Sequence, residues 1–426
     1  MVTMNRLLKK IIPISSFSKN VLTLMTGTTI AQAIPVAISP ILTRIYTPED
    51  FGVLALFVSI TTIFSTLTTG SYEFAIMLPK EDNKAKSIMA LCIFISFFLS
   101  SILFLIISFF HSFFVSKLDS FKFSNWLFFI PLVLFLIGLF NALNYYFARK
   151  KKFHNVAQAN VSKSLGLSIS QVFLHFIKEG AFGLIVGRIV SAILAPFFLI
   201  LKLSKSDKIT FNKDQLLTVG KRYIDFPKFS MWAGLFNNLA LYFNNLVIPV
   251  VFSTTILGFF SLVYRVLVLP LTLISTSVGQ VFFKEATGLK NSNMDIYPIL
   301  WKVVKKMSLI SFFGFSVLFF VIEHLFVFVF GEEWRVAGTY AKYLIPMFMI
   351  RFVVSPLTIT HSIYEAHKSS LLLQLLMFVL SVLCMLAAYG FDFKFEQFLL
   401  LYSSVMVLFY LLRFAIILKI IKLSSR

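Results

Sequence analysis

The sequence predicts an all-α polytopic membrane protein, and three observations support that prediction. The 426 residues are 58% hydrophobic and include 53 phenylalanines. Only 13% of them are charged, whereas soluble proteins carry about 25%. Apolar runs of about 20 residues, each long enough to cross a bilayer as a helix, recur from residue 20 to the C-terminal region. The connections between these runs leave no room for a soluble domain.

The spacing of the runs predicts twelve transmembrane helices, at about 20 residues per crossing. We expect them at 20–42, 52–78, 86–110, 124–148, 155–177, 181–203, 227–252, 255–283, 303–330, 336–362, 369–390 and 397–418. The second and eighth runs are longer than one crossing needs. These two helices should therefore tilt or extend beyond the bilayer.

Lysine and arginine in the connections indicate the orientation, because cytoplasmic connections retain positive charge. One alternate set of connections holds most of these residues, with concentrations at 202–228 and 284–306. The opposite set carries only Arg44, Lys117, Lys122, Lys178, Arg335 and Lys394. We therefore expect both termini in the cytoplasm and an even number of helices.

The longest polar connection lies between the sixth and seventh expected helices and divides the chain into halves. We expect five segments: a cytoplasmic or interfacial N-terminal segment (1–19), an N-terminal six-helix lobe (20–203), a cytoplasmic linker (204–226), a C-terminal six-helix lobe (227–418) and a cytoplasmic tail (419–426).

Internal sequence similarity indicates that the two halves are repeats. YTPEDFGVLALF at 46–57 has the same order of residue types as FSTTILGFFSLV at 252–263, which matches Gly52 with Gly258 at an offset of 206. YFARK at 146–150 resembles YEAHK at 364–368, at an offset of 218. Repeats of this kind are typical of transporters. We therefore expect two pseudo-symmetric six-helix lobes.

Several functional classes are excluded by composition and motifs. The net charge of +21 does not indicate a nucleic-acid partner, because the basic residues lie between hydrophobic runs rather than on a polar domain. Cys92 and Cys384 lie singly in apolar runs, without disulfide or metal-ligand spacing. There is no nucleotide-binding loop, HExxH motif or pair of carboxylates on one face. We expect a secondary-type transporter, with no catalytic residue, metal or cofactor.

Basic side chains at central depths of the expected helices are candidate substrate-binding residues, because a charge at the centre of a membrane helix costs roughly 2.5–3.5 kcal/mol. They are Lys163, Arg188, Arg265 and Arg351. A buried ion pair that fixes packing, for instance Lys163 with Glu73, is one interpretation. However, one carboxylate cannot neutralise four cations. We therefore expect a hydrated cationic cavity that binds an anion, with arginine suited to phosphate or pyrophosphate.

Other polar residues in the expected helices have different roles. Asn237, Asn244 and Asn245 form a polar stripe that either lines the cavity or hydrogen-bonds to neighbouring helices. Glu73 is the deeply placed carboxylate and the candidate for coupling transport to H⁺ or Na⁺. We expect the side chains nearer helix ends to reach the membrane interface; they are Lys342, Arg413 and Glu323.

Four stretches of the chain resemble a known family. They are SPILTRIYTPEDFGVLALF at 39–57, TTGSYEFAIMLPKEDNKAKSIMAL at 68–91, YIDFPKFS before the seventh helix, and GEEWRVAGTYAKYLIP into the tenth. They are similar to the polysaccharide-repeat (O-antigen) flippases of the multidrug/oligosaccharidyl-lipid/polysaccharide (MOP) exporter superfamily. The resemblance implies a MATE-like fold whose two lobes rock between inward-open and outward-open states. Among the cations, Arg265 fits the family pattern best.

The resemblance also implies a function. The protein would move an undecaprenyl-pyrophosphate-linked oligosaccharide repeat unit across the bacterial inner membrane, for O-antigen, lipopolysaccharide or other surface polysaccharide biosynthesis. Membrane lipids and other polysaccharide assembly proteins would be its partners. A MATE-like multidrug/ion antiporter is an alternative, although cationic drugs would favour a cavity rich in carboxylates. A polytopic glycosyltransferase or polymerase is a further alternative, but such an enzyme would be expected to carry a large extracytoplasmic loop.

Overall fold

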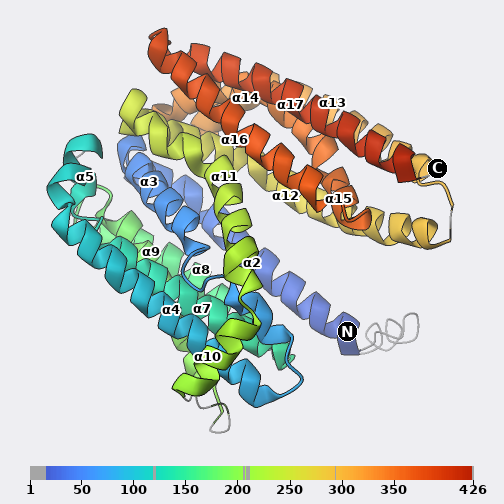
Figure 1. Ribbon diagram of the computed structural model, residues 1–426. Helices are drawn as coiled ribbons and strands as arrows, with labels where there is room; N and C mark the ends of the chain where they lie inside the picture. Colours follow the sequence, from blue (N-terminus) through green and yellow to red (C-terminus); the bar gives the residue numbers. More distant parts are fainter. Residues whose placement is uncertain (1–15, 119–120, 205–206, 208–211, 293, 425–426) are drawn as a thin grey trace, which may run out of the picture. The chain divides into compact units, whose positions relative to one another are not determined.

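The structure is a computed structural model that describes residues 16–118, 121–204, 207, 212–292 and 294–424 (Figure 1). These ranges consist of helices and their connections and contain no strand, so the all-α fold class is confirmed. Eleven helices within them are long and apolar enough to cross a membrane. The remaining long helix, α8 (Phe153–His175), is less apolar because it carries Lys163 and several polar residues. With α8, a long helix lies at each of the twelve expected positions.

The chain forms two compact units. Unit 1 comprises the described residues up to Ile45 together with Ile60–Leu235, and unit 2 comprises Tyr46–Ser59 together with Phe236–Arg426. The lobes expected at 20–203 and 227–418 therefore differ from the units, chiefly at 46–59. This segment starts α3 (Pro48–Ser65), so one helix contributes to both units.

Unit 1 is built mainly from long helices that pack along one another. α8 packs along α2 and α9, and α4 packs along α7 (Figure 1). Its helices, apart from its share of α3, are α2 (Ser16–Ile45), η1 (Tyr72–Met77), α4 (Asp82–Phe109), α5 (His111–Leu118), α6 (Phe121–Ser124), α7 (Phe129–Arg149), α8, α9 (Phe182–Leu201), α10 (Lys213–Arg222) and η3 (Phe226–Ser230).

Unit 2 is arranged around α14 (Arg335–Val354), which packs against three other long helices, α12, α13 and α17 (Figure 1). The other helices of this unit, apart from its share of α3, are α11 (Met231–Val251, from Phe236 onward), α12 (Thr254–Asn291), α13 (Tyr297–Phe330), η4 (Glu332–Trp334), η5 (Ser355–Ile359), α15 (Thr360–Ile363), α16 (His367–Gly390) and α17 (Phe395–Ser424).

The repeated motif starts α3 and α12 with equivalent caps. The Thr47 hydroxyl accepts a hydrogen bond from the Asp50 amide at 3.3 Å, and Asp50 Oδ2 accepts from the Thr47 amide at 3.0 Å. At the second copy, the Ser253 hydroxyl accepts from the Ile256 amide at 3.1 Å. Both caps satisfy amides that the first turn of a helix leaves without partners. The 206-residue offset between the copies therefore describes equivalent helix starts.

The second expected helix, 52–78, ends earlier than predicted. α3 stops at Ser65, and Glu73 lies in the separate 3₁₀ helix η1 rather than inside a membrane helix. The run STLTTGS explains the break. Hydroxyl groups of Ser65, Thr66 and Thr68 donate to backbone carbonyls three residues earlier, which offers the backbone an alternative to the helix. Gly70 and Ser71 then both have positive φ, which ends it.

The alignment of YFARK at 146–150 with YEAHK at 364–368 is wrong in register. Lys151 and Glu365 both have positive φ, 56° and 54°, and each follows the end of a helix. The turns share their hydrogen bonds: the Lys152 amide donates to Phe147 and the Ala366 amide donates to His361. These pairs correspond at an offset of 214, not at the 218 that aligned YFARK with YEAHK. The backbone conformation of the turn is repeated at the offset of 214, whereas the offset that aligns the similar residue types is four residues larger.

Candidate functional site

Each unit contains a polar pocket lined by basic side chains. The pocket in unit 1, here the N-pocket, has a volume of about 240 Å³. Its polar lining comes from α3, α7, α8 and α9 and consists of Thr62, Ser65, Asn141, Lys163, Arg188 and Ser191. The described lining contains no aspartate or glutamate, so the pocket has an excess of positive charge.

Two of the predicted substrate-binding residues meet in the N-pocket. Lys163 comes from α8 and Arg188 from α9, and both are half-buried. The Lys163 ammonium lies 5.2 Å from the centre of the Phe140 ring, a cation–π distance. Ser191, one helical turn from Arg188, is fully buried, and its hydroxyl has no hydrogen-bond partner among the described residues. A bound anion could accept from that hydroxyl.

The ion pair between Glu73 and Lys163, given above as an alternative interpretation, is not formed. The Glu73 carboxylate is buried and accepts a hydrogen bond from the Thr69 hydroxyl, four residues earlier. Within the described residues, no basic side chain lies within ion-pair distance of it. Glu73 is therefore a buried carboxylate without a neutralising cation nearby, which suits a group that takes up a proton or a small cation.

The pocket in unit 2, here the C-pocket, is smaller, at about 130 Å³. It lies among α11, α14, η5, α16 and α17, and its polar lining consists of Asn237, Arg351, Ser355, Thr358, Gln374, Tyr410 and Arg413. Two guanidinium groups thus share one pocket, and no carboxylate belongs to its described lining. Paired arginines present several donors in fixed planes, which is the arrangement that binds phosphate oxygens.

Aromatic side chains hold Arg351 in place. Its Nη1 donates to the Tyr264 hydroxyl at 2.6 Å, across from α14 to α12. Its guanidinium lies 5.6 Å from the Tyr264 ring, 5.5 Å from the Phe348 ring and 6.0 Å from the Tyr410 ring. Neutral rings can stabilise the cation without neutralising it, so the guanidinium keeps its charge for a ligand.

Arg413 was expected to reach the membrane interface, and that prediction is wrong. The side chain lines the C-pocket with Arg351, and its Nε is buried without a hydrogen-bond partner in the described part of the chain. Position along the helix suggested snorkelling because Arg413 lies near the end of an apolar run. The sequence signal that could have identified it is an arginine flanked by apolar residues on both sides, within LLRFAI of the last helix.

Lys342 and Glu323 are paired with each other. Lys342 Nζ lies 3.1 Å from Glu323 Oε2, and the Thr339 hydroxyl donates to Glu323 Oε1 at 3.0 Å. The pair joins α13 to α14 and is partly exposed. The two charges neutralise each other, and neither residue lines the N-pocket or the C-pocket.

Arg265 has a different position from the other three predicted cations. It is exposed on α12, next to Tyr264, and belongs to the lining of neither pocket. Its neighbour Tyr264 contacts Arg351, but successive residues of a helix point in different directions, so Arg265 does not share that contact. Of the four predicted cations, Lys163 and Arg188 thus line the pocket of unit 1, Arg351 lines the pocket of unit 2, and Arg265 is exposed.

The three asparagines of α11 have separate roles. Asn237 lines the C-pocket. Asn245 Nδ2 donates to the Ser59 hydroxyl at 2.9 Å, which ties α11 to α3. Asn244 is buried, and its Oδ1 has no hydrogen-bond partner among the described residues. Of the three, Asn237 alone belongs to a described pocket.

Comparison with solved structures defines the class of the protein. The lipid II flippase MurJ in an inward closed conformation is 13% identical, with a TM-score of 0.72 over 95% of this chain and 90% of that chain. An inward-facing multidrug resistance MATE family transporter of the MOP superfamily is 14% identical, with a TM-score of 0.69 over 94% and 95%. This chain is therefore a polytopic membrane protein with the fold shared by MATE transporters and MurJ.

The family is shown by the sequence itself. Residues 41–338 match the family described as "Polysaccharide biosynthesis protein", and the chain belongs to that family. The resemblance to a polysaccharide-biosynthesis family seen in the sequence is thereby confirmed. A MOP superfamily transporter from Pyrococcus furiosus, described by the reverse polarity of its binding pocket, also shares the fold, at 12% identity and a TM-score of 0.62 over 96% of both chains. No curated protein matches the sequence.

Proposed function

We propose that the protein is a flippase that moves an undecaprenyl-pyrophosphate-linked oligosaccharide repeat unit across the bacterial inner membrane, for O-antigen or another surface polysaccharide. The observation that carries the proposal is the C-pocket, in which Arg351 and Arg413 lie together with no carboxylate in its described lining. The pyrophosphate is the part of such a substrate that must be shielded from the bilayer. Arginine pairs supply bidentate donors for its oxygens.

Transport by alternating access would expose the cationic residues to each side of the membrane in turn. Arg351 and Arg413 would bind the pyrophosphate, Lys163 and Arg188 would supply the charge of the N-pocket, and Arg265 would act as an exposed cation. Asn237 and Gln374 would offer hydrogen bonds to sugar hydroxyls. Glu73 would couple transport to H⁺ or Na⁺. Both termini would lie in the cytoplasm, as the lysine and arginine distribution indicates.

A multidrug/ion antiporter is the second candidate, because a MATE transporter shares the fold. The charge of the pockets argues against it, since organic cations would be repelled by two arginines in one pocket and by a lysine with an arginine in the other. An enzyme, such as a polytopic glycosyltransferase or polymerase, has less support. The fold is shared with transporters and a flippase, and the long helices follow one another through short connections.

The experiment that tests the proposal is complementation of a strain lacking this gene, with surface polysaccharide as the readout. Arg351→Ala should reduce polysaccharide by roughly tenfold or more, because a hydrogen-bonded charge contact is lost. Arg335→Ala is the matched control, since Arg335 starts the same helix and pairs with Glu332 at 2.6 Å. Immunoblotting of membranes checks that each variant is present. Full complementation by Arg351→Ala, or drug efflux that requires Arg351, would contradict the proposal.

A further inference from the structure

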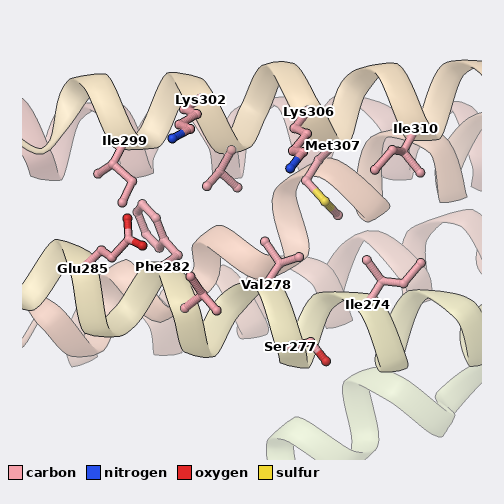
Figure 2. A pocket seen from close by; sticks show the side chains of 12 residues that line it. Ile274, Ser277, Val278, Phe282, Glu285, Ile299, Lys302, Lys306, Met307 and Ile310 are labelled. Carbon is pink, nitrogen blue, oxygen red and sulfur yellow. The ribbon is translucent and has the colours of Figure 1, made fainter. Parts of the chain in front are cut away.

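A groove between α12 and α13 is separate from both cationic pockets (Figure 2). Its volume is about 470 Å³, and most of its lining is apolar. Its floor is formed by Phe282 and Met307, which are 1% and 2% exposed, whereas Val281 and Ile310 at its mouth are exposed. An apolar groove with an open mouth on a membrane protein can accept a hydrocarbon chain.

The groove has charged residues at one end and in its middle, and apolar residues at the other end (Figure 2). Lys302 and Lys306 extend from α13 beside the groove, and Glu285 extends from α12 (Figure 2). Ile274 and Ile310 lie at the opposite end (Figure 2). The two lysines are exposed, and neither is within ion-pair distance of a described carboxylate. They therefore remain available to an anion.

The lengths of the two helices place this polarity at a membrane surface. α12 has 38 residues and α13 has 34, so they are about 57 Å and 51 Å long, against about 30 Å of hydrocarbon and about 6 Å of headgroup on each side. Their ends at Thr254 and Phe330 adjoin the polar residues Ser253 and Gly331–Glu332, which suit the headgroup layer. From there, the far hydrocarbon boundary lies about 36 Å along each helix, close to Val278 and Lys306.

The groove thus crosses that boundary. Its apolar end lies at the depth of lipid tails, Lys306 lies at the boundary, from which its long side chain can reach the phosphates, and Lys302 and Glu285 lie at the depth of phosphates and headgroups. The positive-inside distribution assigns this side to the cytoplasm, whose facing leaflet carries anionic lipids. We propose that the α12–α13 groove binds an anionic phospholipid of the cytoplasmic leaflet, with one acyl chain in the groove and its phosphate on Lys302 and Lys306.

The charges favour a phospholipid such as phosphatidylglycerol over the other lipids present. A zwitterionic headgroup would bring its own cation toward the two lysines, whereas phosphatidylglycerol offers a phosphate to the lysines and hydroxyls to the Glu285 carboxylate. The carrier lipid of the proposed substrate is a weaker candidate. Its pyrophosphate must move across the membrane, whereas these lysines lie at one surface.

The test uses the purified full-length protein in mixed micelles and counts retained lipids by native mass spectrometry. Phosphatidylglycerol should be retained in preference to phosphatidylcholine, and each of Lys302→Ala and Lys306→Ala should weaken retention by about fivefold, the effect of one basic residue near an anionic surface. Lys305→Ala is the matched control, because Lys305 is exposed on the same helix but does not line the groove.

A second variant tests the acyl site without changing charge. Val278→Trp should fill the groove and reduce retention of phosphatidylglycerol, while thermal unfolding shows whether the variant is folded. Equal retention by wild type and the Lys302→Ala/Lys306→Ala double variant would overturn the proposal, as would equal retention of phosphatidylcholine. Displacement of phosphatidylglycerol by undecaprenyl phosphate at equimolar concentration would assign the groove to the carrier lipid instead. None of these readouts requires transport, so they are independent of the proposed function.

Discussion

Gly52 and Gly258, the matched glycines of the repeated motif, lie where the first turns of α3 and α12 cross. A Cβ on Gly52 would lie 2.8 Å from the carbonyl carbon of Thr254, and a Cβ on Gly258 would lie 2.7 Å from that of Pro48. Pro48 and Thr254 are themselves related by the 206-residue offset. Each copy of the motif therefore contacts the other in the same way, as in an isologous interface, and this contact explains why 46–59 packs within unit 2.

We expect Gly52→Ala and Gly258→Ala each to destabilise the protein by about 1–3 kcal/mol, because the added methyl group would meet backbone that cannot rotate away. Gly288→Ala is the control in the same helix as Gly258, since no heavy atom lies within 4 Å of a Cβ added there. Thermal unfolding in detergent measures the difference. Unchanged melting of the Gly258→Ala protein would show that the two helices cross less closely than the structure indicates.

The Tyr264 hydroxyl should position Arg351 for substrate. Tyr264→Phe keeps the ring but removes the 2.6 Å hydrogen bond, so transport should fall by roughly three- to tenfold. The affinity of the variant for substrate should fall together with transport, while the amount of the variant in the membrane stays normal. Tyr297→Phe is the control, because the Tyr297 hydroxyl donates to the Leu418 carbonyl at 3.3 Å and lines neither cationic pocket. Equal transport by Tyr264→Phe and wild type would remove the positioning role.

Glu73 should make transport depend on the coupling ion. Glu73→Gln keeps the hydrogen-bonding shape but cannot bind or release a proton, so flipping in liposomes should lose its response to a pH or Na⁺ gradient and fall to a basal rate. Glu81→Gln is the control, since Glu81 is exposed in the connection after η1 and pairs with Lys84 at 2.8 Å. A Glu73→Gln protein with normal gradient-driven flipping would exclude Glu73 from coupling.

Much of the fold was predictable from the sequence because bilayer thickness fixes helix length. A long helix lies at each of the twelve expected positions. The end of α3, however, was not predictable from hydropathy. Side-chain hydroxyls and the positive φ of Gly70 and Ser71 end it inside an apolar run. The repeat was recognised correctly where the chain has a cap and a close crossing, at Gly52 and Gly258. It was misaligned at Lys151, where the turn conformation is repeated and the residue types are not.

The candidate site was only partly predictable, because depth along a helix does not give the direction in which a side chain points. Lys163, Arg188 and Arg351 were identified by depth and line pockets. Arg413 has the same role but lies near a helix end, so depth alone placed it at the interface. Ser191, a buried hydroxyl of the N-pocket, carries no charge and gave no signal in the sequence.

Asp207 should make the stability of unit 1 depend on pH in the acid range. Burial raises the pKa of Asp207, but hydrogen bonds from Ser204 and Tyr146 and the charge of Lys152 outweigh burial and lower the pKa to about 2. Because the unfolded value is about 3.9, the group stabilises the fold fully above that pH and loses its effect as pH falls toward 2. The contribution is on the order of 2 kcal/mol.

This pH dependence can be measured by comparing the wild type with Asp207→Asn. The melting temperature of the variant should be lower at pH 6, and the difference should shrink as pH falls from 4 toward 2. Asp214→Asn is a control from the helix that follows, where Asp214 is exposed in the first turn of α10. A difference that stays constant over this range would show that Asp207 acts through shape rather than through its charge.

Arg265 should be required for transport but not for stability. Its side chain is exposed on α12, so Arg265→Ala removes little packing and should leave the free energy of unfolding within about 0.5 kcal/mol of the wild-type value. In the deletion strain, however, we expect the variant to abolish surface polysaccharide, because the exposed cation would be the group that an anionic substrate meets. Arg265→Lys separates charge from geometry. If lysine restores polysaccharide fully, Arg265 attracts the substrate as a point charge; if it fails, the bidentate guanidinium is needed. Full activity of Arg265→Ala would restrict substrate binding to the two pockets.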